Sequence, residues 1–277
     1  MYKKIFFIPL FVLFFASCTT IEINEEDVFD IKRTIHPEAL SNSAYQAEEI
    51  RIPTTSDIFL EAWYIQQPGA RNTVLYFGGN GFIMETARQI IYSILEQEVN
   101  LLVFNYRGYG INPGNPSVEG LKRDGLAIYD YLINEKNIDP QRLILHGHSM
   151  GSFIATYVSN NRKTRSLVLE SPITDLNDWT KTAIPWFLKP FIHFKFDSAL
   201  VQNSNLEQIK QVSSPLLILT GKQDKITPPE LSHKLFATAT VRNKQLLIID
   251  DGGHNDLPMK ATYHTAIRNF YHTHPKE

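Results

Sequence analysis

One serine in this chain stands in a pattern that favours nucleophilic chemistry. Ser149 lies between Gly147 and Gly151, after the apolar run 143–145 and before a stretch with helical periodicity. Glycines at these positions allow a sharp turn from strand to helix, which strains the serine backbone and exposes its hydroxyl. The helix N-terminus at this point favours developing negative charge. The motif predicts a nucleophile elbow, and the alternative is a glycine-rich turn without catalytic partners.

A nucleophilic serine needs a base that takes its proton and a carboxylate that orients the base. In α/β hydrolases the three residues follow in the order Ser, acid, His, with the last two in loops after late strands. Asp224 follows the apolar run 215–220, and His254 follows the run 245–250. We therefore expect Asp224 to be the acid and His254 to be the base. Glu170 and Asp175, which follow the preceding apolar run, are alternative acids.

The remaining histidines and nearby acids fit these roles less well. His146 and His148 flank Ser149 in the chain and cannot fold back onto its hydroxyl. Other histidines lie on or beyond the last expected helix, namely His264, His272 and His274. Asp251 and Asp256 are expected to be surface or capping groups.

Acyl transfer also needs two backbone N–H donors for the oxyanion. Met150, directly after the predicted nucleophile, is expected to supply one. The glycine-rich loop 78–81 follows the apolar run 73–77 and lets the backbone approach a ligand, so we assign the second donor to Asn80. The alternative is a glycine-rich turn with no catalytic role.

These residues require a scaffold that brings strand ends together. Two strand-like runs, 49–53 and 58–65, are expected to form an antiparallel edge, and apolar runs then alternate with helical stretches. Ser117 is expected to cap a helix that extends to about Glu135. The alternation predicts an α/β-hydrolase fold with a mainly parallel sheet and helices on both faces. Ligands of such sheets bind beyond the carboxyl ends of the strands.

The alternation stops at about residues 172–212. This segment is rich in aromatic residues, and Pro185 and Pro190 divide it into short pieces. A structureless loop of this length is uncommon in a domain. We therefore expect a small helical cap over the active site, inserted in a single α/β domain at 45–277.

The amino terminus has the pattern of a bacterial lipoprotein signal. Lys3 and Lys4 precede an apolar run at 5–16, which is too short to span a bilayer as a stable helix. Residues 15–18 resemble the lipobox, in which Cys18 is lipidated, although Phe15 stands where Leu is usual. We expect a signal peptide at 1–17, a membrane anchor through lipid on Cys18 and a polar tether at 18–44. The alternative is an ordinary secretory signal.

The predicted location is a bacterial cell envelope. Thr19 and Thr20 stand where an Asp retains some lipoproteins at the inner membrane. In a double-membraned cell we therefore expect the outer membrane, facing the periplasm. The chain has one cysteine, so no disulfide can form within it, and its net charge of −2 does not favour a nucleic-acid partner. We expect neither a cofactor nor a metal, and the sequence does not predict an oligomeric state.

Several further motifs resemble one family. They are residues 105–110, residues 113–121 with Asp124, the pair 171–172, Gly221 with Asp224, and residues 253–256. With these motifs, the chain from about residue 50 to 271 resembles the bud-emergence-type α/β hydrolases, a branch related to prolyl oligopeptidases. The resemblance implies a serine hydrolase with a triad of Ser149, Asp224 and His254, often associated with membranes. One departure is Gly78, where relatives usually carry His before Gly-Asn, and it is expected to alter the support of that loop.

The predicted function is hydrolysis of carboxylic esters or thioesters through an acyl-enzyme. The substrate is expected to be a small molecule or a molecule that carries an acyl group. An amidase or peptidase would use the same groups, and the sequence does not separate the two because the leaving-group pocket lies in the cap. A non-catalytic envelope binding protein on a hydrolase scaffold is a further alternative, although such a protein has no need for all three triad residues.

Overall fold

The apolar runs form the strands of one large sheet in this computed structural model, which describes residues 19–33, 45–55, 57–184 and 187–273. Within these residues the sheet has eight strands in the order β10-β9-β7-β6-β4-β5-β3-β2. They are β2 (Gln46–Thr55), β3 (Ile58–Gln66), β4 (Thr73–Phe77), β5 (Asn100–Phe104), β6 (Leu143–His148), β7 (Ser166–Glu170), β9 (Leu216–Gly221) and β10 (Lys244–Ile249). β3 pairs antiparallel with β2 and with β5, and the other neighbouring strands are parallel. The predicted antiparallel edge on a mainly parallel sheet is therefore confirmed.

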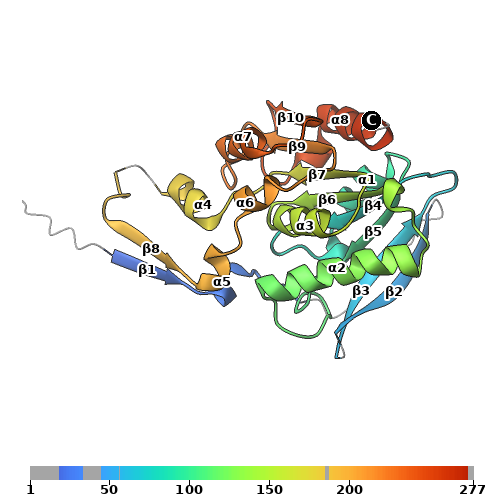
Figure 1. Ribbon diagram of the computed structural model, residues 1–277, viewed down its shortest axis with the longest axis horizontal. Coiled ribbons are helices and arrows are strands. Elements are labelled where there is room, and N and C mark those ends of the chain that lie inside the picture. Colours follow the sequence, from blue (N-terminus) through green and yellow to red (C-terminus); the bar gives the residue numbers. More distant parts are fainter. Residues whose placement is uncertain (1–18, 34–44, 56, 185–186, 274–277) are drawn as a thin grey trace, which may run out of the picture.

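Helices cover both faces of this sheet (Figure 1). One face carries α1 (Arg88–Leu95), α8 (Ala261–His272) and the 3-10 helix η4 (Leu257–Met259). The other carries α2 (Val118–Asn134), α3 (Met150–Asn161), α6 (Asn205–Ile209) and α7 (Pro229–Thr238). Short 3-10 helices η2 (Met84–Thr86) and η3 (Pro140–Arg142) precede α1 and β6. The expected cap of α2 is present, because Ser117 Oγ accepts a hydrogen bond from the N–H of Gly120 at 3.1 Å.

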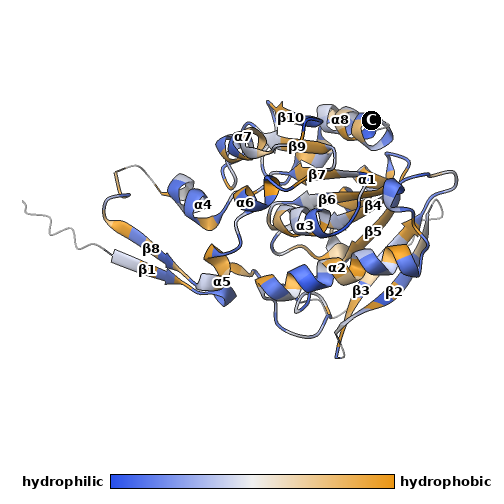
Figure 2. Ribbon diagram, viewed as in Figure 1, coloured by the Kyte–Doolittle hydropathy of each residue, from blue (hydrophilic) through white to orange (hydrophobic). Residues whose placement is uncertain are grey.

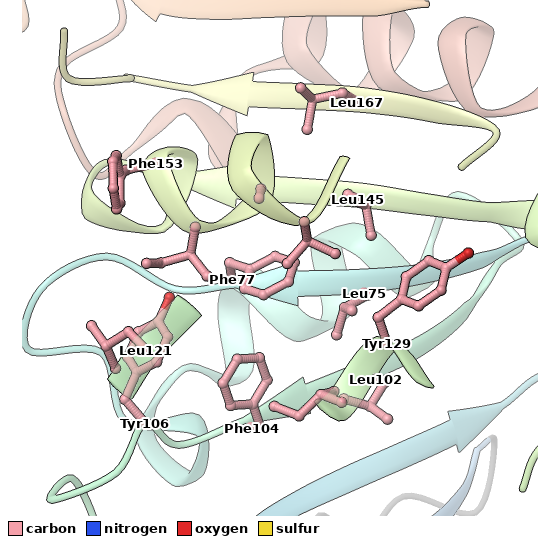
Figure 3. Packing of buried hydrophobic residues seen from close by; sticks show 14 of the residues in the cluster. Leu75, Phe77, Leu102, Phe104, Tyr106, Leu121, Tyr129, Leu145, Phe153 and Leu167 are labelled. Atoms are coloured by element: carbon pink, nitrogen blue, oxygen red, sulfur yellow. The ribbon is translucent and has the colours of Figure 1, made fainter. Parts of the chain in front are cut away.

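Alternate residues of the central strands point to opposite faces of the sheet. On β4, Leu75 and Phe77 join the core beneath α2 and α3, whereas Val74 and Tyr76 join the core beneath α1 and α8. Figure 3 shows Phe77 and Phe104 in the first of these clusters. Their rings pack edge to face, and the ring centroids are 5.7 Å apart. Burial on both faces explains why β4 is apolar after its first residue. This core fixes the carboxyl ends of the strands, and the predicted site residues follow those ends.

The beginning of the predicted tether is folded onto the domain. Thr19–Ile23 forms the strand β1, and Glu25–Val28 forms the 3-10 helix η1. β1 pairs in parallel with β8 (Ile192–Phe196). Ile21 and Ile23 alternate with polar residues, and this alternation stabilises a strand once a partner strand is available. The prediction of a free tether is therefore wrong for residues 19–33.

The rest of that amino-terminal prediction is not tested. The signal peptide at 1–17, the lipidated Cys18 and the tether residues 34–44 lie outside the described residues. In the part of the chain that the structure describes, no helix has the length and apolar character needed to cross a bilayer.

The insertion between β7 and β9 contains α4 (Leu176–Ala183), β8, α5 (Ser198–Val201) and α6. β8 is a strand that the sequence analysis did not predict. With β1 it forms a two-stranded sheet that projects from the body of the domain (Figure 1). The insertion and the amino-terminal segment therefore build one structure together, although they lie far apart in the chain.

Candidate active site

The predicted elbow has a strained backbone at its serine. Ser149 has φ 52° and ψ −118°, a conformation that L residues rarely adopt. A Cβ at Gly151 would lie 2.1 Å from the backbone oxygen of Phe77, and a Cβ at Gly147 would lie 2.4 Å from that of Gly151. Backbone packing therefore requires glycine at both flanking positions. The serine follows β6 and precedes α3, as the motif predicts.

The three residues predicted as a triad meet at this edge of the sheet. Ser149 Oγ lies 3.1 Å from His254 Nε2, and His254 Nδ1 lies 2.8 Å from Asp224 Oδ2. An ionised carboxylate only accepts hydrogen bonds, so it holds the imidazole proton on Nδ1 and leaves Nε2 as an acceptor. The loop of His254 is closed by Asp256, which accepts a hydrogen bond from the N–H of Gly253 at 2.6 Å. The geometry thus suits transfer of the serine proton to His254.

Asp224 is held by its own loop. Its Oδ1 accepts hydrogen bonds from the N–H groups of Ile226 and Thr227 at 2.9 and 2.8 Å, and the residue is only 3% exposed. Burial alone would raise the pKa of Asp224, but hydrogen bonds from His254 and Thr227 keep the pKa below its ordinary value. Asp224 is therefore ionised at neutral pH and can stabilise a positive charge on His254.

Two residues that were not predicted as partners of His254 also contact it. The Thr227 hydroxyl lies 3.0 Å from His254 Nδ1 and 2.9 Å from Asp224 Oδ2. His148 Nε2 lies 3.0 Å from the backbone oxygen of His254, so this nitrogen carries a proton and donates a hydrogen bond to that oxygen. Burial lowers the pKa of His148, which favours the neutral ring. The Asp-x-x-Thr spacing of a side-chain-capped turn could have indicated Thr227. No local pattern indicates His148, because its partner is 106 residues away.

The alternative acids contact other groups. Glu170 Oε2 lies 3.1 Å from His146 Nε2 and accepts a hydrogen bond from the Tyr263 hydroxyl at 3.0 Å. Burial alone would raise the pKa of Glu170, but the hydrogen bond with His146 helps to keep the pKa below its ordinary value. Asp175 accepts a hydrogen bond from a backbone N–H in the first turn of α4 and caps that helix. Each of these carboxylates therefore has a structural role away from His254.

The glycine-rich loop after β4 lies against the elbow. A Cβ at Gly79 would lie 3.3 Å from Ser149 Cβ and 2.8 Å from His148 Nδ1. Only glycine leaves this approach open. At Gly78, where relatives usually carry His, a Cβ would lie 2.1 Å from Cγ of Phe82. The Phe82 ring therefore occupies the space of the missing side chain, which explains how this loop accommodates the departure.

Asn80 is fixed in this loop by its side chain. Its Oδ1 accepts hydrogen bonds from the Tyr109 hydroxyl at 2.9 Å and from the N–H of Asp30 at 2.8 Å, and its Nδ2 donates to the backbone oxygen of Val28 at 2.8 Å. The Tyr106 hydroxyl donates to the first residue of the same loop at 2.8 Å. Both tyrosines belong to the 105–110 motif, so this motif holds the loop in place beside the elbow.

An apolar cavity of about 500 Å³ opens beside Ser149, and Asn80 and Met150 both line it. Apolar side chains from the amino-terminal segment and the insertion form much of its wall, including Ile23, Val28, Phe29, Leu176, Trp179 and Leu200. Its charged residues are Asp27 and Asp175. A cavity of this kind accommodates an apolar group next to the nucleophile. The amino-terminal part of the wall was missed in the sequence because its polar composition indicated a tether.

The described residues form no evident metal site. None of their His, Cys, Asp and Glu side chains form a group of three or more that could hold a metal ion.

Comparison with known proteins places the chain among α/β hydrolases. A model of the prolyl oligopeptidase family matches residues 120–273, which include Ser149, Asp224 and His254. Alpha/beta hydrolase domain-containing protein WAV2 of Arabidopsis thaliana is 30% identical over 224 residues, which cover 76% of this chain and 72% of WAV2. Protein bem46 of Schizosaccharomyces pombe is 28% identical over 232 residues, which cover 80% of this chain and 76% of bem46.

A solved structure supports the same fold. The esterase Pf2001 of Pyrococcus furiosus superposes with a TM-score of 0.70 over 87% of this chain and 98% of its own, at 20% sequence identity. The α/β-hydrolase fold expected from the sequence is therefore confirmed.

Proposed function

Because this chain belongs to the prolyl oligopeptidase family of α/β hydrolases, we propose that it is a serine hydrolase that cleaves carboxylic esters or thioesters. The observation that carries the proposal is the line of contacts from Ser149 Oγ through His254 to Asp224, with distances of 3.1 and 2.8 Å. These contacts lie beside an apolar cavity of about 500 Å³. The cavity favours a substrate with an apolar acyl group.

In the first half of the reaction, Ser149 Oγ attacks the carbonyl carbon of the ester while its proton passes to His254 Nε2. Asp224 stabilises the resulting imidazolium through its hydrogen bond with Nδ1. The carbonyl oxygen becomes an oxyanion, which accepts hydrogen bonds from the backbone N–H groups of Met150 and Asn80. The tetrahedral intermediate then collapses, the leaving alcohol or thiol takes the proton from His254, and the acyl group remains on Ser149.

In the second half, water replaces the alcohol. His254 Nε2 accepts a proton from the water, whose oxygen attacks the acyl carbon, and the oxyanion forms again in the same place. Collapse of this intermediate breaks the bond to Ser149 Oγ, which recovers its proton from His254. The products are the carboxylic acid and the free enzyme, so the reaction consumes one water and requires no other reactant.

An amidase or peptidase activity is the second candidate, and the family to which the chain belongs supports it. The same residues would act, but a poorer leaving group would have to be protonated by His254. The two carboxylates in the cavity wall, Asp27 and Asp175, could face a basic group of a peptide. Hydrolysis of p-nitrophenyl butyrate compared with that of butyryl p-nitroanilide separates the two activities, and we expect the ester to be preferred.

Labelling with a fluorophosphonate probe tests the mechanism directly. We expect the wild-type protein and a matched Ser198→Ala variant to react, because Ser198 is exposed at the start of α5. Ser149→Ala should not react, and its ester hydrolysis should fall on the order of a millionfold, as for other serine hydrolase triads. Equal labelling of folded Ser149→Ala and wild type would refute the assignment of the nucleophile.

We also propose that the protein is anchored to a bacterial envelope membrane through lipid on Cys18. The apolar run 5–16 and the residues 15–18 support this proposal. In a double-membraned cell, Thr19 and Thr20 favour the outer membrane, with the domain facing the periplasm. Metabolic labelling with an alkyne fatty acid should mark the wild type and not Cys18→Ser. An unlabelled wild-type protein in a host that makes lipoproteins would favour an ordinary secretory signal.

A further inference from the structure

The two-stranded β1–β8 sheet has one apolar face and one polar face. In the parallel register Ile21 lies beside Phe194, and Ile23 lies beside Phe196. The intervening positions pair Glu22 with Lys195, whose side chains form an ion pair at 2.7 Å. At the inner end of the apolar face, Ile23 and Phe196 pack against the core of the domain.

Four large apolar residues on β1 and in the turn that leads into β8 are exposed, and we call them the outer tip. It consists of Ile21, Phe187, Leu188 and Phe191, which are 40%, 54%, 38% and 40% exposed. Figure 1 shows the outer end of β1 and β8 at the point farthest from the large sheet, and Figure 2 shows that apolar residues gather at the start of β8. Exposed large apolar side chains in one region of a surface are typical of sites that contact another protein or a membrane.

The chain enters the domain at this same tip. The backbone N–H of Thr19 donates a hydrogen bond to the backbone oxygen of Phe191 at 2.8 Å. The residue before Thr19 is Cys18, and the apolar run 5–16 precedes it. A lipid on Cys18 would therefore be attached one residue away from the backbone that holds Phe191. One residue spans only about 3.3 Å in a strand. A lipid on Cys18 would therefore hold the outer tip close to the surface of the membrane.

We propose that the outer tip inserts into the surface of the lipid bilayer to which the chain is anchored. This inference rests on the proposed anchoring through Cys18. Lys189, which is exposed between Leu188 and Phe191, suits this location because a basic side chain can reach anionic headgroups while its neighbours enter the acyl region. A single anchor would leave the orientation of the domain free, whereas a second apolar contact fixes it.

The proposed orientation has a consequence for the substrate. Ile23 belongs both to the apolar face of β1 and to the wall of the cavity that contains Ser149. An apolar path therefore leads from the outer tip along β1 toward the nucleophile. The substrate class that fits this path is an ester whose acyl chain partitions into the bilayer, and a soluble short ester would reach Ser149 without it.

Spin labelling of the full-length protein in vesicles tests the insertion. The lipidated thiol of Cys18 cannot react, so Leu188→Cys and Phe191→Cys each carry one label. Phe59→Cys is the matched control, because Phe59 is also an exposed phenylalanine, at 44%, and lies on β3 at the far side of the domain (Figure 1). The protein is reconstituted into vesicles of phosphatidylethanolamine and phosphatidylglycerol, and collision rates of the label are measured with oxygen and with a water-soluble nickel complex.

We expect the ratio of oxygen to nickel collisions at positions 188 and 191 to exceed the ratio at position 59 by about tenfold, because oxygen concentrates in the acyl region and the nickel complex is excluded from it. Equal ratios at the three positions would overturn the proposal. Dipolar broadening between labels that disappears on dilution with unlabelled protein would show a second copy at the tip and would also overturn it. Fluorophosphonate labelling of each variant checks that it is folded.

Two further measurements separate this inference from the proposals on which it rests. Thiol labelling of the wild-type protein reports whether Cys18 is already modified, independently of the depth of positions 188 and 191. Hydrolysis is then measured with a long-chain ester dissolved in the vesicles and with soluble p-nitrophenyl butyrate. Phe191→Ser should lower the ratio of the two activities by about tenfold, the factor expected for losing part of one buried aromatic side chain. Phe59→Ser should leave that ratio unchanged, and an equal effect of both variants would contradict the inference.

Discussion

Asp224→Asn exchanges one oxygen of the acid for an amide nitrogen, and the loop dictates which oxygen is replaced. Oδ1 accepts backbone hydrogen bonds from Ile226 and Thr227 at 2.9 and 2.8 Å, whereas Oδ2 faces His254 Nδ1 at 2.8 Å. Two N–H donors require an oxygen, so the amide NH₂ of the substituted side chain must take the place of Oδ2. An amide nitrogen only donates, and His254 Nδ1 must then accept. The proton moves to Nε2, which can no longer take a proton from Ser149.

The magnitude follows from losing the correct tautomer while the rest of the site is intact. In a chymotrypsin-like protease, the same change in the triad lowers kcat by about 10⁴-fold, which corresponds to about 5.4 kcal/mol of transition-state stabilisation. We expect a loss of about this size for the hydrolysis of p-nitrophenyl butyrate. The cavity wall is unchanged, so the KM should stay within about threefold of the wild-type value, since the effect falls on the chemical step.

The assay compares kcat and KM of Asp224→Asn with those of a matched control. Asp250→Asn makes the same chemical change at an exposed carboxylate, whose ion-pair partner among the described residues is the exposed Lys222, at 2.9 Å. Exposed ion pairs contribute little, so the control should keep its activity within about twofold. Circular dichroism confirms that each variant is folded. A folded Asp224→Asn protein with more than about a tenth of wild-type kcat would refute the tautomer argument, and a larger loss in folded Glu170→Gln would reassign the acid.

Three further substitutions test the supports of the site. Gly151→Ala should destabilise the protein by about 3 kcal/mol or more in urea unfolding, because its Cβ would lie 2.1 Å from a backbone oxygen; a loss below about 1 kcal/mol would contradict the close packing at the elbow. Arg107→Leu should cost about 3–5 kcal/mol, because it leaves the fully buried Asp124 without the partner that contacts it at 2.6 and 2.5 Å, and adding Asp124→Leu should recover part of that loss. Burial lowers the pKa of His148, which faces Glu170. Below about pH 6.5 the unfolded chain therefore binds a proton at His148 that the folded chain does not bind. The free energy of unfolding consequently falls as the pH decreases. His148→Gln should reduce that slope between pH 6.5 and 5 by up to about 1.4 kcal/mol per pH unit, and identical slopes in urea unfolding would contradict the neutral, buried ring.

The sequence predicts those parts of the fold that local chemistry decides. β4 and the first half of β6, residues 143–145, are apolar on both faces, and this pattern indicates a buried strand wherever the neighbouring strands lie. The elbow glycines, the turn of Asp224 and the cap of α2 depend on residues within a few positions of each other. The placement of His254 has another basis, namely the order in which α/β hydrolases carry the acid and the base in the loops after late strands. These features could therefore be predicted from local spacing together with the residue order of the fold.

The features that were missed depend on partners far apart in the chain. Glu22 and Lys195 form an ion pair across β1 and β8 although 173 residues separate them. Each of the two strands is short, and neither has a neighbouring partner in sequence that would indicate a hairpin. A two-stranded sheet of this kind is stable only when it packs on other elements, so its existence follows from the cap and the core together. The support that His148 gives to His254 has the same origin.

Part of the cavity wall lies inside the residues that match the family model, and part lies outside them. Ser149, Asp224 and His254 lie within residues 120–273, which match the family model. The same range contains three cavity residues of the insertion, namely Leu176, Trp179 and Leu200. Ile23, Val28 and Phe29 lie outside this match, yet they close the same cavity. Ser149, Asp224 and His254 therefore lie in the part of the chain that matches the family model, whereas part of the wall beside Ser149 comes from an amino-terminal segment outside that match. That segment also begins one residue after Cys18, so the residues that shape the cavity and the residue proposed to hold the anchor are covalently continuous.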